Sequence, residues 1–202
     1  MKRYTVKRSR WVGLLLTIPL CSNSLFGMIG LEQKSSEIKA VENLKDEDII
    51  AVLMSRNTES AYAAVEEIMR RGDRMIPLLQ RCKGEKRFFY GYGLGHRLST
   101  FVIPFPVKGT EIDDGSFITI EVAALYLISS IYHKTTEFAE APYLTDGKPV
   151  SWQRFNTPER VREAWESTEK WIEAFKSEGL ETLRSKRLSP LSRSKVHFWA
   201  TR

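Results

Sequence analysis

Three side chains within residues 84–116 have types and spacing that could support catalysis. His96 ends a Gly-Tyr-Gly-Leu-Gly-His run, and glycines let backbone N–H groups approach an anion beside an imidazole that exchanges protons. Asp113 and Asp114 precede a glycine, and paired carboxylates can bind a hard cation or act as acid and base. Such residues are also typical of turns and helix caps, which is the interpretation we favour. A small hydrolase-like enzyme with its cleft at residues 84–116 is therefore an alternative hypothesis.

Motifs that define a particular chemistry are missing from the sequence. A zinc site needs three or four nitrogen or sulfur ligands, usually with two of them close together. His96, His133 and His197 are widely separated, and neither His-Glu-x-x-His nor Cys-x-x-Cys occurs. Gly-x-Ser-x-Gly and the Walker loop do not occur either. We therefore predict no metal and no cofactor, and we favour a non-catalytic function.

Residues 84–116 interrupt the helical pattern with six glycines and two prolines, and they are rich in aromatic residues. A structureless connection of this length would exceed the ordinary limit of about 15 residues. The segment therefore either folds onto the helices through its aromatic side chains or forms the working surface. Four of these side chains are candidate binding residues: Phe88, Phe89, Tyr90 and Tyr92.

Residues 1–24 have the pattern of a signal peptide. A basic start is followed by an uncharged, Leu-rich run over residues 11–20, and the small residues Ser22 and Ser24 fit the positions before a cleavage site. We predict cleavage near Ser24 and export to a periplasmic or extracellular location. An uncleaved membrane anchor and a lipid-modified Cys21 are the alternatives.

Loss of this leader changes the charge balance. The chain has 31 Lys and Arg against 25 Asp and Glu, and five of the basic residues lie in the leader, which leaves 26 against 25. A net charge of +1 argues against nucleic acid as a partner. Only Cys82 remains as a thiol, so no internal disulfide can form, and helical spacing places Cys82 on a buried face.

Apolar residues at helical spacing between Asp46 and Gly179 predict a mainly α, compact domain. The run at 118–132 is apolar nearly all round, which indicates a central helix, and residues 141–156 are predicted as a loop. The predicted organisation is a signal peptide (1–24), an N-terminal lead-in (25–45), a helical domain (46–183) and a basic C-terminal tail (184–202). Helices are predicted from Asp46 to about Arg56, over 59–71, from Asp73 to about Lys83, over 118–132, and from a Thr157 cap to Gly179.

Residues 59–83 resemble one degenerate HEAT-type repeat. The sequence Ala-Tyr-Ala-Ala-Val-Glu-Glu-Ile-Met-Arg-Arg-Gly is followed by Met-Ile-Pro-Leu-Leu, with Gly72 at the end of the first helix and Pro77 near the start of the second. The resemblance implies an antiparallel helix pair, and it covers about one eighth of the chain. No second copy occurs at a fixed period, so a long solenoid is not predicted.

The last 19 residues contain six basic residues and no acidic one. This tail could attach to an anionic envelope surface, dock an acidic partner, or pack on its own domain. Our leading hypothesis is an exported, non-catalytic helical module that binds a protein or envelope component through residues 84–116 or through the tail. The tail's candidate binding residues are Arg187, Arg193 and Lys195, and surface attachment would also use Arg184 and Lys186.

Overall fold

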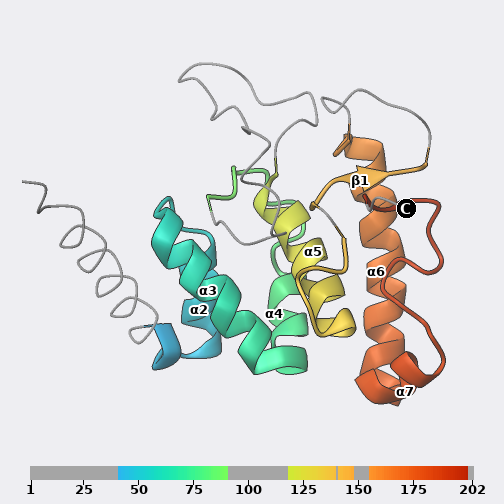
Figure 1. Ribbon diagram of the computed structural model, residues 1–202, viewed down its shortest axis with the longest axis horizontal. Helices are drawn as coiled ribbons and strands as arrows, with labels where there is room; N and C mark the ends of the chain where they lie inside the picture. Colours follow the sequence, from blue (N-terminus) through green and yellow to red (C-terminus); the bar gives the residue numbers. More distant parts are fainter. Residues whose placement is uncertain (1–40, 91–117, 140, 148–154, 200–202) are drawn as a thin grey trace, which may run out of the picture.

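The computed structural model describes residues 41–90, 118–139, 141–147 and 155–199. The predicted signal peptide and four candidate site residues, Tyr92, His96, Asp113 and Asp114, lie outside these ranges. Helices account for most of the described residues, as Figure 1 shows, and this confirms the predicted mainly α fold. In the described part of the chain, no helix is both long enough and apolar enough to cross a membrane.

The first two described helices, α2 (Asp46–Leu53) and α3 (Thr58–Arg71), pack against each other. Asp46 was predicted as the cap of α2, but it is the first helical residue, and Lys45 precedes it without a side-chain cap. The carboxylate instead binds the Arg71 guanidinium at the far end of α3. The side chain of Asn57 caps α3 by accepting a hydrogen bond from the backbone N–H of Ser60 at 2.9 Å.

The helix predicted from Asp73 begins as a 3-10 turn, η1 (Gly72–Met75), and continues as the short α4 (Ile76–Gln80) with Pro77 in its first turn. Cys82 is 1% exposed, so the predicted burial is confirmed, and burial raises the pKa of its thiol to about 11. Helix α3 packs mainly along α2 and the central helix, and α4 packs on the central helix. The HEAT-like resemblance itself remains a prediction.

The central helix is α5 (Ile120–His133), which lies between the α2–α4 side of the molecule and α6 in Figure 1. Every residue from Ile120 to Tyr132 is buried, as the all-round apolar pattern predicted. The Thr119 hydroxyl caps the helix by accepting from the Val122 backbone N–H at 3.4 Å.

Helix α6 (Pro158–Glu178) has the predicted Thr157 cap, and Gly179, at φ +80°, ends it. The short α7 (Leu180–Ser185) follows directly. Residues 141–156 were predicted as loop, but they include β1 (Leu144–Thr145), which pairs antiparallel with β2 (His197–Phe198) near the C-terminus. Two-residue strands show no alternation, so the sequence pattern could not reveal this pairing.

Candidate functional site

Short backbone pairing joins the two segments that flank residues 91–117. The Phe89 N–H donates to the Ile118 carbonyl at 2.9 Å, and the Ile120 N–H donates to the Arg87 carbonyl at 2.9 Å. The buried carboxylate of Glu121, in the first turn of α5, accepts from the Gly84 N–H at 3.0 Å and pairs with Lys86. The intervening segment therefore leaves and re-enters the domain at one place, the start of α5.

Only part of the predicted aromatic surface is available to a partner. Phe89 was predicted as a binding residue, but it is 4% exposed and packs in the core, so its ring is not presented on the described surface. Phe88 and Tyr90 are half-buried and meet edge to face, with ring centroids 4.8 Å apart. These two rings are the only aromatic binding candidates in the described part of the chain, because Tyr92 lies outside it.

The basic tail is packed on its own domain as far as the structure describes it. We call residues 186–199 the strap. The indole Nε1–H of Trp171 donates to the Leu188 carbonyl at 2.8 Å, and the Ser167 hydroxyl donates to the Pro190 carbonyl at 2.9 Å. Further along, the Glu163 carboxylate accepts from the Lys195 backbone N–H at 2.8 Å.

These three anchors set the direction of the strap. Their order on α6 is opposite to their order in the strap, so the strap runs antiparallel to α6 over the nine residues from Trp171 back to Glu163, or about 12 Å of helix. Its far end is fixed by the buried Val196 and by the pairing of β2 with β1. An irregular segment is therefore held in one geometry by side chains of α6.

Two of the tail cations have structural partners. The Arg184 guanidinium donates to the Tyr132 carbonyl at 2.8 Å and to the Ile131 carbonyl, and it also pairs with Glu181. A cation in this position stabilises the negative end of α5 and satisfies its last carbonyl groups. Lys186 pairs with Glu178. Both charges are therefore used within the domain.

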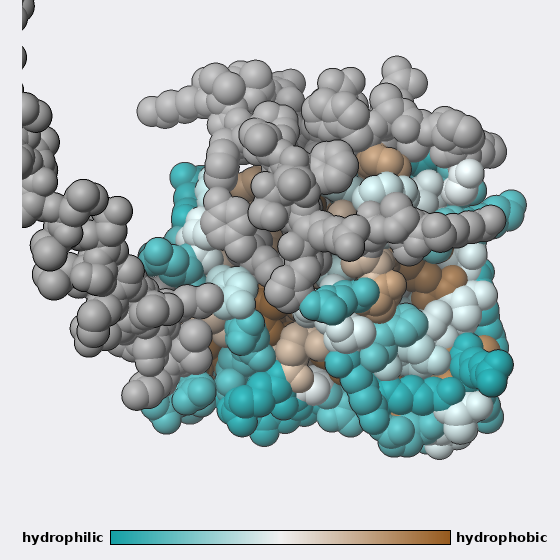
Figure 2. Space-filling view, viewed as in Figure 1, coloured by the Kyte–Doolittle hydropathy of each residue, from teal (hydrophilic) through white to brown (hydrophobic). Residues whose placement is uncertain are grey.

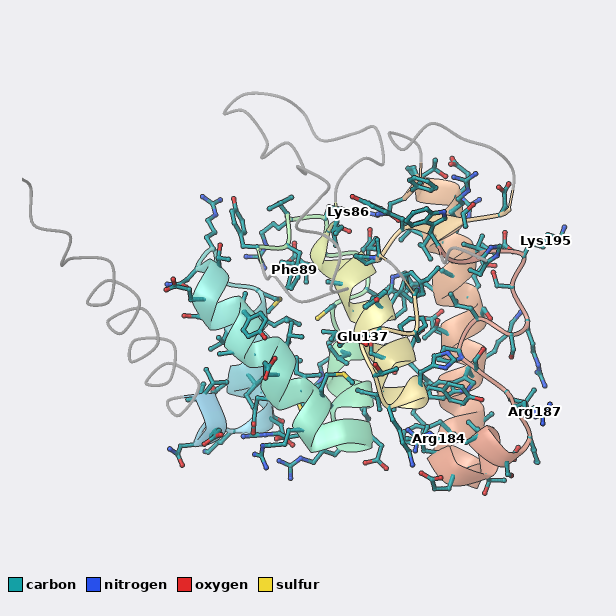
Figure 3. The ribbon with its side chains drawn as sticks, viewed as in Figure 1. Lys86, Phe89, Glu137, Arg184, Arg187 and Lys195 are labelled. Atoms are coloured by element: carbon teal, nitrogen blue, oxygen red, sulfur yellow. The ribbon has the colours of Figure 1, made fainter. Side chains whose placement is uncertain are left out.

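The remaining strap cations are exposed, and no carboxylate among the described residues forms an ion pair with them. In Figure 3, Arg187 and Lys195 point away from the body of the molecule along the side formed by α6 and the strap. Lys170 of α6 is likewise exposed and has no described ion pair. We call this group the basic edge: Lys170, Arg187, Arg193 and Lys195.

Part of the basic edge surrounds a small depression of about 20 Å³ between α6 and the strap, which has room for about one water-sized group. Lys170 and Arg193 contribute from opposite sides, and the hydroxyl groups of Ser189 and Ser192 also line it. The Trp171 side chain lies on its α6 side. Of the described residues that line the depression, none is acidic. Two cations are therefore the charged groups of its described lining.

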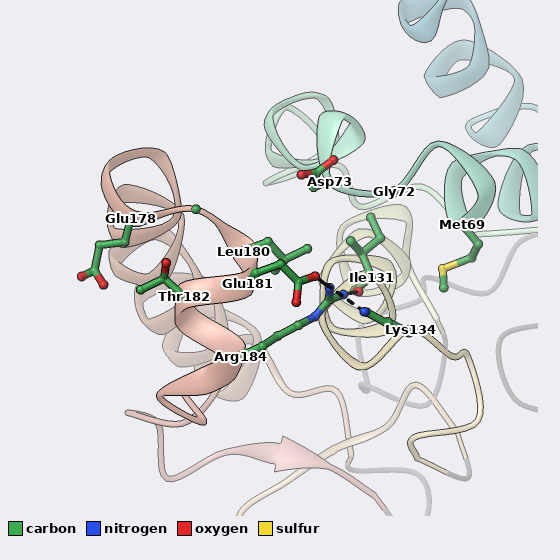
Figure 4. Close-up of a pocket in the computed structure, with 11 residues that line it drawn as sticks. Met69, Gly72, Asp73, Ile131, Lys134, Glu178, Leu180, Glu181, Thr182 and Arg184 are labelled. Carbon is green, nitrogen blue, oxygen red and sulfur yellow. Dashed lines mark hydrogen bonds and ion pairs between the residues drawn. The ribbon is translucent and has the colours of Figure 1, made fainter.

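A larger groove of about 620 Å³ lies where α3, α5 and α6 end. Its lining combines apolar side chains with the carboxylates of Asp73, Glu178 and Glu181. Figure 4 shows that Glu181 pairs with both Arg184 and Lys134, and its carboxylate lies 3.6 Å from the Lys134 ammonium. The Arg184 guanidinium lowers the pKa of the Glu181 carboxyl group. Most charges of the groove therefore neutralise one another.

The rest of the described surface gives no sign of a metal centre. Across residues 41–90, 118–139, 141–147 and 155–199, no three side chains of His, Cys, Asp or Glu gather as metal ligands would. In Figure 2, the face over α6 and α7 is mostly hydrophilic, with small apolar patches between the polar groups. No protein-family model matches the chain, and no curated protein or solved structure matches it.

The residues that position the basic edge were not predicted as site residues. Ser167 is a buried polar residue on the apolar face of α6, and Trp171 was assigned to the core alone. A hydroxyl and an indole N–H on a buried helical stripe both require hydrogen-bond acceptors, and this requirement was the available signal. The identity of those acceptors, two strap carbonyls, depends on the tertiary structure.

Proposed function

We propose that this protein is an exported, non-catalytic helical module whose basic edge binds an acidic macromolecular partner. The observation that carries this proposal is the set of exposed cations without described ion pairs on a strap that α6 holds in place. Export remains part of the proposal and depends on the leader-like residues 1–24.

Rigid presentation makes these cations suited to binding. An exposed ion pair contributes only about 0.2–1 kcal/mol, partly because two long side chains must be ordered. The backbone of the strap is already fixed by hydrogen bonds to Ser167, Trp171 and Glu163, so a partner does not bear the cost of ordering it. Several such contacts together also steer an acidic partner toward this side of the molecule.

The paired backbone at residues 85–89 and 118–121 supports a second contact surface. It presents Phe88 and Tyr90 at the start of α5, at the place where residues 91–117 leave and re-enter the described domain. An aromatic pair with a tyrosine hydroxyl is typical of protein interfaces. The surface that carries Phe88 and Tyr90 is therefore a second candidate site for a protein partner, after the basic edge.

The experiment that tests the proposal compares elution from immobilised polyanions. The full chain, the variant Arg187→Glu/Lys195→Glu and a control with the same charge change, Arg56→Glu/Arg81→Glu, are applied to columns carrying polyglutamate or polyphosphate. Arg56 lies between α2 and α3 and Arg81 follows α4, both outside the strap. We expect the basic-edge variant to elute at clearly lower salt than the control. Equal elution of the two variants would refute the proposal.

A further inference from the structure

We infer that Lys170 and Arg193, which line the depression between α6 and the strap, bind a phosphate group that lies over it, and that the partner of the basic edge is a linear polymer carrying such groups. This inference depends on the proposed function, because it names the chemistry of the partner at the same edge. Lys170 and Arg193, one on α6 and the other on the strap, line the depression, and no described lining residue is acidic.

The donor set of the depression fits a tetrahedral oxyanion. Arg193 supplies a planar fork of N–H donors, and Lys170 supplies a compact ammonium group on the other side. Ser189 and Ser192 add hydroxyl groups to the lining, although the Ser192 hydroxyl already donates to the Ser189 carbonyl at 2.8 Å. Two cations and a hydroxyl donor suit a phosphate with several acceptor oxygens better than a carboxylate with two.

Buried apolar side chains strengthen this site. Trp171 is 5% exposed and Leu183 is fully buried, and both contribute to the lining of the depression. A low-dielectric floor beneath the two cations makes their attraction for an anion stronger than it would be in open water. The Trp171 indole N–H is occupied by the Leu188 carbonyl, so the ring supports the site without donating to the ligand.

Acidic side chains on α6 limit the shape of the partner. Glu166 and Glu173, one turn before and after Lys170, have side chains 60% and 69% exposed, and they pair with Arg162 and Lys176. A flat anionic lipid surface laid on this side would approach these carboxylates. A narrow chain can lie along the strap, which includes Arg187, Arg193 and Lys195 and contains no carboxylate side chain.

Nucleic acid is also a linear phosphate polymer, but the basic edge lacks what single strands require. Bases stack on exposed aromatic rings, and each stacked base contributes about 1–3 kcal/mol. Within the described strap and α6, Trp171 and Phe198 are buried, and Trp199 and Phe175 are only half-exposed and already lie against other rings. The edge therefore offers contacts to a phosphate backbone, and none of these four aromatic side chains gives it an open stacking surface.

The test measures binding of the full chain to linear inorganic polyphosphate by isothermal titration calorimetry. Wild type is compared with Lys170→Glu/Arg193→Glu and with Arg56→Glu/Arg81→Glu, which carries the same charge change elsewhere and the same basic N-terminus. We expect the depression variant to bind polyphosphate at least about tenfold more weakly than the control, which should bind like wild type. If circular dichroism shows that Lys170→Glu/Arg193→Glu does not fold, Lys170→Gln/Arg193→Gln is used in its place.

Further ligands separate failure of this inference from failure of the proposed function. Phosphatidylglycerol vesicles, single-stranded DNA and polyglutamate are titrated under the same conditions, and we expect each to bind more weakly than polyphosphate. Equal polyphosphate binding by the depression variant and the control would overturn the phosphate site. The phosphate site would also be overturned if vesicles, DNA or polyglutamate bound more tightly than polyphosphate. If that binding were lost in Arg187→Glu/Lys195→Glu, the proposed function would still be supported. Absence of binding to every polyanion would overturn both.

Discussion

The groove at the ends of α3, α5 and α6 and the depression beside the strap are both lined by charged side chains, but their charges have different partners. In the groove, Glu181 lies between Arg184 and Lys134, and Arg184 also binds the last carbonyls of α5. In the depression, Lys170 and Arg193 have no acidic neighbour among the described lining residues. The larger cavity is therefore the one whose charges stabilise the fold, and the smaller one has charge available for a ligand.

This difference shows that cavity size is a weaker guide to binding than charge balance. A cation that is already paired and hydrogen-bonded must lose those partners before it can bind anything else. An exposed cation on a fixed backbone gives up only water. Substitutions in the groove should therefore affect mainly folding, and substitutions in the depression should affect mainly binding.

The largest expected effect is that of Arg184→Ala on stability. The change removes the hydrogen bonds to the Ile131 and Tyr132 carbonyls and the ion pair with Glu181. We expect the free energy of unfolding, measured in urea, to fall by about 2–3 kcal/mol, with polyanion affinity unchanged. Arg187→Ala is the matched control and should stay within about 0.5 kcal/mol of wild type. Equal destabilisation by both variants would remove the distinction between the two regions.

The second effect concerns the anchoring of the strap. Trp171→Phe removes the indole N–H that binds the Leu188 carbonyl, and we expect the free energy of local strap opening to fall by about 1 kcal/mol. Amide hydrogen exchange of residues 186–196 reports this opening. Trp165→Phe is the control, since the Trp165 indole N–H is buried without a hydrogen-bond partner. Faster exchange of the strap in both variants alike would show that loss of ring volume is responsible.

These two regions also show what could be predicted from sequence. Helices α5 and α6 are long and strongly periodic, and the Thr157 cap and Gly179 stop are local signals, so both helices were predicted well. The strap has no periodicity, and its course depends on which carbonyls meet Ser167 and Trp171. The β1–β2 pairing joins two dipeptides far apart in the chain, and no local pattern encodes it.

Only the amino-acid composition of the candidate site could be predicted from the sequence. The excess of Lys and Arg after residue 183 is visible in the sequence, and Arg187, Arg193 and Lys195 are exposed as surface binding requires. Arg184 has the same side chain as Arg187 three residues later, yet it is fixed at the end of α5. Only the folded position of each side chain separates a structural cation from an available one.

A third, smaller effect is expected for single changes in the depression. Arg193→Ala and Lys170→Ala should each weaken polyphosphate binding about threefold to fivefold, because each removes one exposed ionic contact. Neither should change the free energy of unfolding by more than about 0.5 kcal/mol. Titration calorimetry and urea unfolding of the same samples measure both quantities. A loss of stability without a loss of affinity would place these cations in the same class as Arg184.

The smallest expected effect is the pH dependence of the groove. Arg184 lowers the pKa of the Glu181 carboxyl group in the folded protein. Glu181 therefore stabilises the fold above the ordinary carboxyl pKa, and this contribution is lost as pH falls through the folded-state pKa. The difference in unfolding free energy between wild type and Glu181→Gln should be largest at about pH 7 and shrink as pH falls below the ordinary carboxyl pKa. A difference independent of pH would mean that the carboxylate charge has no role there.

The strap cations are available for binding because folding does not need them. The most direct test replaces Arg187, Arg193 and Lys195 together by Gln in the full chain and measures unfolding free energy and polyphosphate affinity on the same preparation. We predict an unfolding free energy within about 0.5 kcal/mol of wild type per substitution and an affinity lower by about tenfold or more. Unchanged affinity with a stability loss like that of Arg184→Ala would contradict the claim.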